Sequence, residues 1–171
     1  GKADGTISAT FTAAAAPTPP ALAVGYVYYA RLGAVRIDAS ARIVKTQQRG
    51  PVARYVVQGS GSTPTLPVLA SGTAGAPATP TWATVAWSVV APPTAASLQI
   101  IAASSGGSVI AAPNSNYGGN ASTSNPAFCQ AAVGSAFVRS FCDLPLETSN
   151  ISWASDVASQ SLLTVGWTDL L

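Results

Sequence analysis

The stretch YYARLGAVRIDASARIV, residues 28–44, carries the clearest periodicity in the chain. From Gly33 onward, apolar side chains occupy the odd positions, while arginine, aspartate and serine occupy the even positions. Alternation with a period of two is typical of a strand that buries one face. We therefore predict a strand over 33–44. Its odd face, from Val35 to Ile43, is expected in the core, and its even face carries Arg36 and Arg42.

Further short apolar segments, each bounded by Gly, Pro, Asn or Ser, extend this pattern along the chain. We predict strands at 6–12, 52–58, 82–90, 97–103, 108–112, 133–141 and 162–168. Between them, 59–81 is expected to hold only turns and short strands, and 113–126 a long polar loop. Short strands separated by turn signals, without a long periodic helix, indicate an all-β sandwich or barrel. At 171 residues the chain has the length of a single domain, 1–171.

Charge is scarce in this chain and unevenly placed. Charged residues are 8% of the sequence, against about 25% in an average soluble domain. The 84 residues from Tyr55 to Val138 carry no charged side chain. An isolated monomer normally spreads charge over its surface, so we expect neighbouring molecules to cover much of this chain.

Six of the eight basic residues lie in one segment that contains a single acid, Asp38. They are Arg31, Arg36, Arg42, Lys45, Arg49 and Arg54. Arginine and lysine bind phosphates and release their counterions, but this segment lacks the interleaved aromatic residues of a base-stacking surface. We predict that these six residues contact a neighbouring subunit in preference to RNA.

Catalysis and metal binding are poorly supported by the residue types present. The chain has no histidine, which excludes Ser-His-Asp and Cys-His arrangements within it and makes a zinc site implausible. Asp143, Glu147, Asp156 and Asp169 could supply paired carboxylates of the glycosidase kind, but solvated or interface charges explain them better. We expect no enzyme activity and no cofactor. No apolar stretch reaches the ~20 residues of a membrane helix, so no membrane partner is expected.

The two cysteines and four tryptophans leave alternatives open. A disulfide, two buried thiols and one reactive thiol all fit Cys129 and Cys142, and we favour buried thiols, because free cysteine is usually buried. Trp87 and Trp167 fall on the apolar phase of their predicted strands, so we expect both in the core. Trp82 and Trp153 are undecided between the core and a surface that stacks on sugar rings.

Several short motifs occur in the order found in the coat proteins of tymovirus-like plant viruses (tymoviruses and marafiviruses), which the chain resembles over roughly 24–168. These motifs are Thr84-Val85-Ala86-Trp87, Ala91-Pro92-Pro93-Thr94, Tyr117-Gly118-Gly119, Phe128-Cys129, Gly134-Ser135, Cys142-Asp143-Leu144, Asn150-Ile151 and Leu162-Leu163. Arg31 and Leu32 match the end of a Tyr-Arg-His-Ala-x-Leu segment of that family, although its histidine is absent here. The spacing from there to Thr84 is longer than in the family, so 46–81 resembles an inserted loop region.

The resemblance implies a single eight-stranded jelly-roll β-sandwich of the viral capsid type. It implies self-assembly into an icosahedral shell around an RNA genome, and a place in the virion. The partners would be other copies of the same chain and, weakly, viral RNA. The alternative is a receptor- or carbohydrate-binding β-domain of a viral or phage fibre or spike, because YYARLGAVRI also resembles a pattern of trimeric tail-fibre modules.

Overall fold

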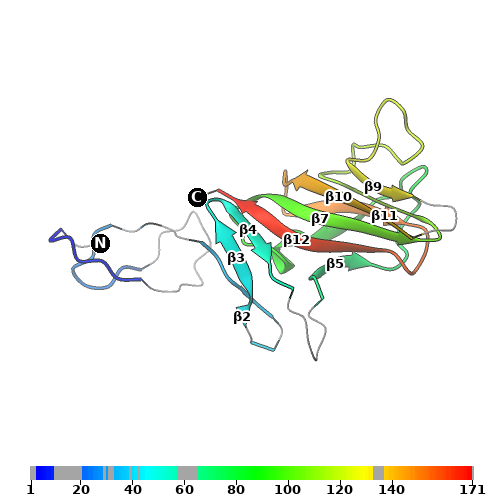
Figure 1. Ribbon diagram of the computed structural model, residues 1–171. Coiled ribbons are helices and arrows are strands. Elements are labelled where there is room, and N and C mark those ends of the chain that lie inside the picture. The colour runs from blue at the N-terminus through cyan, green and yellow to red at the C-terminus, as the bar shows by residue number, and fades with distance from the viewer. Residues whose placement is uncertain are drawn as a thin grey trace.

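The fold is all-β, with antiparallel sheets in an arrangement compatible with a β-sandwich (Figure 1). The computed structural model describes residues 3–9, 21–28, 30, 33–38, 40–41, 43–57, 65–132 and 137–170. Within these ranges the helical structure is one 3-10 turn, η1 (Trp87–Val89). The described residues form no helix of the length and apolarity that crossing a membrane requires.

The larger sheet has six strands among the described residues. They are β3 (Thr46–Arg49), β4 (Val52–Tyr55), β5 (Val68–Ser71), β7 (Ala95–Ser105), β10 (Phe137–Pro145) and β12 (Ser161–Asp169). Their order is β10-β7-β12-β4-β3, and β5 pairs with the first part of β12. Figure 1 shows the long strands β7 and β12 side by side. β12 thus lies in the middle of the sheet, although it comes last in the chain.

The smaller sheet has four strands, β6 (Ala83–Ala86), β8 (Ser108–Ala112), β9 (Cys129–Ala132) and β11 (Asn150–Ser155). Their order is β6-β11-β8-β9, and every pairing is antiparallel. In both sheets, strands that are far apart in the sequence therefore lie next to each other.

The main core cluster lies where side chains of the two sheets meet, and a smaller cluster contains Ile110, Ala127 and Ala154. β7 and β12 contribute Leu98, Ile100, Leu162 and Trp167, and the smaller sheet contributes residues such as Ile151. Each of these five side chains is at most 1% exposed. Burial of their apolar surface is the main force that holds the sheets together.

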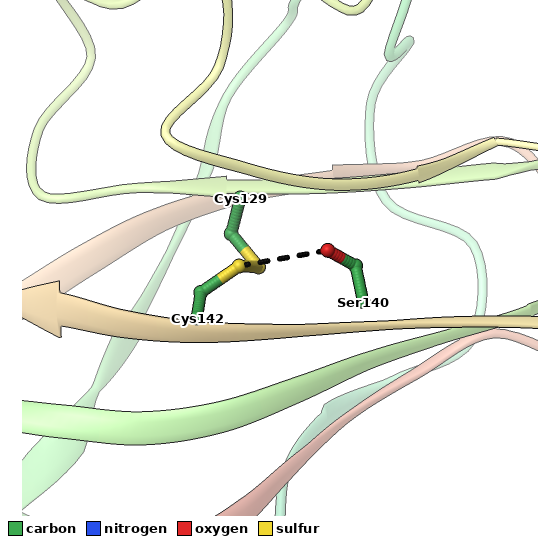
Figure 2. Close-up of a disulfide and its surroundings, with 3 residues drawn as sticks. All are labelled: Cys129, Ser140 and Cys142. Carbon is green, nitrogen blue, oxygen red and sulfur yellow. Dashed lines mark hydrogen bonds between the residues drawn. A yellow bond between two sulfur atoms is a disulfide. The ribbon is translucent and has the colours of Figure 1, made fainter.

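A disulfide joins the two sheets at one edge (Figure 2). Cys129 begins β9 and Cys142 lies in β10, and their Cα atoms are 5.8 Å apart. Ser140 Oγ lies 3.8 Å from Cys142 Sγ, and its hydroxyl is the donor because a disulfide sulfur carries no hydrogen. The preferred interpretation of two buried thiols was therefore wrong. The cysteines are 13 residues apart in the sequence, and this spacing does not show that they face each other from different sheets.

The predicted strand over 33–44 is instead a small hairpin, separate from both sheets. β1 (Arg36–Ile37) pairs with β2 (Ile43–Val44), and the chain reverses between them. In the turn, Asp38 Oδ1 accepts the Ser40 N–H at 2.9 Å, and Ala41 has a positive φ of 59°. An Asx turn of this kind permits a reversal that period-two alternation cannot reveal.

The odd face of this hairpin is not core, which overturns the prediction. Val35, Ile37 and Ile43 are 45%, 61% and 67% exposed. The even residue Arg36 and its strand neighbour Val44 are the half-buried ones. The hairpin therefore turns its arginine side toward the rest of the chain and its apolar side outward.

Several other predictions from the sequence differ from the structure. The region 46–81 is not only an inserted loop, because β3, β4 and β5 lie in it and join the larger sheet. Residues 6–9 of the predicted first strand form no strand, and the remainder of 6–12 lies outside the described residues. β4, β6, β7, β8, β10 and β12 overlap predicted strands, whereas β3, β9 and β11 were not predicted as strands.

The tryptophans are largely internal. Trp87 and Trp167 are 8% and 1% exposed, which confirms their prediction as core residues. Trp153 is 7% exposed and belongs to the same core cluster. Trp82 is half-buried, and its Nε1 donates to the Tyr117 carbonyl at 3.1 Å. The undecided pair, Trp82 and Trp153, is thus part of the packing.

Candidate subunit and RNA interface

The six predicted contact residues do not form one surface in the described structure. Arg31 and Arg42 lie outside the described residues. Arg36 lies on the hairpin, and Lys45 is exposed between β2 and β3. Arg49 and Arg54 lie on the β3–β4 hairpin of the larger sheet. The described members therefore divide into a hairpin group and a sheet group.

Arg36 ties the small hairpin to the body of the molecule. Its Nε donates to the Val89 carbonyl at 2.9 Å, and its guanidinium carbon lies 6.0 Å from the ring centre of Tyr55. The Tyr55 hydroxyl donates to the next carbonyl, that of Val90. Burial raises the pKa of Tyr55 to about 12, and the positive charge of Arg36 opposes this rise. Arg36 thus contacts its own chain, so we do not place it in an intermolecular interface.

A hollow of about 330 Å³ lies between the small hairpin and the ends of β4 and β5. Its lining combines aliphatic side chains with one acid, one lysine and Tyr55. The lining residues are Asp38, Ile43, Val44, Lys45, Tyr55, Val56, Val57, Thr65, Leu66 and Pro67. Lys45 is therefore at the rim of a mixed depression and not on the same patch as Arg49.

The sheet group faces outward, away from the core. Gln47 pairs with Arg54, and Arg49 pairs with Val52. Directly opposed residues share a face of the sheet, and so do residues two apart on one strand, so both arginines lie on the same face. Both arginines are exposed. Arg54 Nε donates to Gln99 Oε1 at 3.3 Å, across the intervening strand β12.

Gly166 makes this reach possible. It is the register partner of Arg54 on one side and of Gln99 on the other. A Cβ at this position would lie 2.1 Å from the Ala53 carbonyl oxygen, so only glycine fits so close to β4. The absence of a side chain at 166 also leaves room for the arginine to cross β12.

The same outer face carries residues that the sequence prediction missed. β10 exposes Phe137, Arg139, Phe141 and Asp143, which alternate along the strand. The guanidinium carbon of Arg139 lies 4.5 Å from the ring centre of Phe137. The alternation is visible in the sequence, but the position of these residues on the same face as Arg54 depends on register across β7 and β12, which the sequence alone does not supply.

The four acids of the possible catalytic pool belong to different elements. Asp143 lies in β10 and Asp169 ends β12, where it is 3% exposed. Asp156 Oδ1 accepts the Ser108 N–H at 2.7 Å, and Glu147 Oε2 accepts a hydrogen bond from Asn114 Nδ2. Within the described ranges there is no group of three His, Cys, Asp or Glu residues placed to hold a metal ion. Two of these carboxylates thus serve to hold loops in place.

Comparison with known proteins found no matching family model, no matching curated protein and no matching solved structure.

Proposed function

We propose that this chain is the coat protein of an icosahedral, tymovirus-like RNA virus, folded as a jelly roll, and that it self-assembles into the shell that encloses the genome. Its place is then the virion. Its partners are other copies of itself and, more weakly, the RNA.

The strand order supports the jelly roll. With β3 and β5 set aside as additions to the larger sheet, eight strands remain, from β4 to β12. The first of them pairs with the last, β4 with β12, and the second with the seventh, β6 with β11. The third pairs with the sixth, β7 with β10, and the fourth with the fifth, β8 with β9. Such nesting arises when one long antiparallel ribbon is rolled into two facing sheets.

Fold alone does not give function, and the observation that carries the assembly proposal is the uncovered apolar surface on the N-terminal side. Val35, Ile37 and Ile43 lie exposed on the small hairpin, and Val24 and Val27 are 99% and 57% exposed. In Figure 1 the blue N-terminal segment extends away from the two sheets, whereas β2 of the small hairpin lies near β3. Ile37 and Ile43 are register partners, so the small hairpin presents exposed apolar groups side by side. Such groups mark contact surfaces, and copies repeated on a closed symmetric surface would cover them.

The disulfide is a second support. Bonds between cysteines persist in oxidising surroundings, including the surfaces of virions, and are rare in the cytosol. A shell that must survive outside the cell fits this chemistry.

The alternative proposal, a receptor- or sugar-binding fibre domain, has less support. A sugar platform built on tryptophan needs an exposed indole, whereas Trp153 is buried and Trp82 donates its indole N–H to a backbone carbonyl. A fibre module would form a stable trimer instead of a closed shell.

Light scattering and negative-stain microscopy of the purified chain test the proposal. We expect closed spherical particles of uniform size when the protein is concentrated near neutral pH. Only monomers, or a stable trimer at every concentration and ionic strength tried, would refute the coat-protein assignment.

A further inference from the structure

The outer face of the six-stranded sheet combines aromatic rings with arginines. On β10, Phe137 and Phe141 are 56% and 59% exposed, and Arg139 lies between them on the same face. Phenylalanine rings this exposed are unfavourable in water unless something covers them. The guanidinium of Arg139 already stacks over one ring, that of Phe137.

Basic groups continue across the sheet from this aromatic strand. The row through Asp143, Gln99 and Gly166 reaches Arg54 and then Gln47 of β3, and Arg49 lies two positions further along β3 on the same face. The distance from β10 to β3 is roughly 19 Å, at about 4.8 Å per strand. Arg54 is held in position by its hydrogen bond to Gln99, so its charge is presented at a fixed point of the face.

We infer that this outer face binds single-stranded RNA, with Phe137 and Phe141 stacking on bases and Arg49, Arg54 and Arg139 contacting phosphates. Aromatic rings beside a positively charged track are the physical requirements for such binding, because every base has a flat apolar surface and every nucleotide a negative charge. Cation–π contact between arginine and a ring or base adds to it. The choice of RNA as the polyanion rests on the proposed function.

The charge of this face favours RNA over a second copy of the chain as its binding partner. Among the described strand residues, the exposed charges of this face are three arginines and one acid, Asp143. Two identical faces of net positive charge repel each other, whereas a polyanion is attracted to each. The apolar face of the small hairpin, which carries no exposed arginine in its described residues, is the better surface for contact between copies.

The test measures binding of a fluorescently labelled, unstructured oligouridylate to the unassembled full-length chain by anisotropy over a series of salt concentrations. The paired substitution Phe137→Leu and Phe141→Leu keeps apolar bulk but removes the flat rings. We expect it to weaken binding roughly tenfold per ring, with an unchanged slope of log affinity against log salt.

Arg54→Gln together with Arg139→Gln should also weaken binding but, unlike the leucine pair, should change its salt dependence. Binding weakens, and the salt slope becomes shallower by about 0.7 for each phosphate that is no longer neutralised. Phe128→Leu is the matched control, because Phe128 is 43% exposed but precedes β9 of the other sheet, so its variant should bind like the wild type.

Unchanged RNA affinity in the leucine pair overturns the inference, as does a loss equal to that of Phe128→Leu. A leucine pair that retains RNA binding but no longer self-associates in sedimentation would assign the face to a second copy instead. Particle formation is recorded separately by microscopy. Failure to form shells refutes the coat-protein proposal and leaves the binding result standing on its own.

Discussion

Arg36 and Tyr55 form a small unit in which charge, ring and backbone act together. Arg36 donates to the Val89 carbonyl and Tyr55 to that of Val90, so the two side chains hold successive carbonyls at the end of η1. Tyr55 also meets Trp167 edge to face, with ring centres 5.5 Å apart. Aromatic pairs of this geometry add about 0.5–1.5 kcal/mol beyond simple burial.

Tyr55 makes stability fall at high pH. Its pKa is about 12 in the folded chain and near 10 when unfolded, so the folded state resists ionisation. Its contribution to the free energy of unfolding is complete below pH 10 and is lost progressively as the pH rises toward 12. We expect urea unfolding at pH 9, 10.5 and 11.5 to show this decline. In Tyr55→Phe, stability at pH 9 should be about 1 kcal/mol lower, and the decline should be smaller. An equal decline in both proteins would contradict the assignment.

Two glycines with positive φ allow the cost of backbone strain to be measured apart from the cost of a steric clash. Gly75 has φ +66°, and a Cβ there would lie 1.7 Å from the Thr81 carbonyl oxygen, whereas Gly72, at φ +95°, has nothing within 4 Å of its Cβ position. Gly72→Ala should cost about 1–2 kcal/mol through strain. Gly75→Ala should cost a further 1–3 kcal/mol, because Ala74 bonds to Ser155 and the segment cannot shift freely. Chemical denaturation of both variants measures the difference, and equal losses would show that the clash is relieved.

At the scale of the element, prediction from sequence was best for strands with apolar character of their own. β7, β8 and β12 are rich in Leu, Ile and Val and are covered on the core side, so their patterns identify them. β3, with the sequence TQQR, has no apolar side chain and is a strand because of its neighbour β4 in the sheet. β11, with NISWAS, alternates polar and apolar residues only from Asn150 to Trp153, and the sequence prediction missed this short signal.

The small hairpin shows a second limit. Its apolar and polar residues do alternate. Alternation shows which residues share a face of the strand, but it does not show which of the two faces is buried. The reversal at Asp38–Ala41 and the bond from Arg36 to Val89 decide that. Similarly, the candidate RNA face could not be predicted as a unit, because the pairing of four strands places Phe141 and Arg54 on the same face of the sheet.

The Cys129–Cys142 disulfide holds the edge strands β9 and β10 together. Cross-linking a loop of this length restricts the unfolded chain and is worth about 3 kcal/mol. We expect the double variant Cys129→Ala, Cys142→Ala to have a free energy of unfolding about 3 kcal/mol lower, seen as a lower urea midpoint. A reductant should destabilise the wild type similarly and leave the double variant unaffected. Wild-type stability that is insensitive to full reduction would show that packing alone closes this edge.

For the whole molecule, the assembly proposal predicts that stability and assembly respond to different residues. Ile37→Thr with Ile43→Thr changes two exposed, β-branched positions, so the unassembled chain should keep its unfolding free energy within about 0.5 kcal/mol. Particle yield in light scattering should fall sharply. Ile151→Thr, the same exchange at a side chain 1% exposed, should instead destabilise the chain itself. Normal particle yield from the hairpin variant would remove this hairpin from the proposed contact.

The central position of β12 also has a consequence for the time course of folding. β12 joins β4 and β5 to β7, so the larger sheet is complete only after residues more than 90 positions apart in the chain have met. Non-local pairing of this kind slows folding, because loop closure comes before the contacts that reward it. During synthesis the ribosome releases β4, β5 and β7 before their shared partner exists. Until then their edges are open to other chains, so a cell that makes this protein in quantity needs chaperones most during this interval.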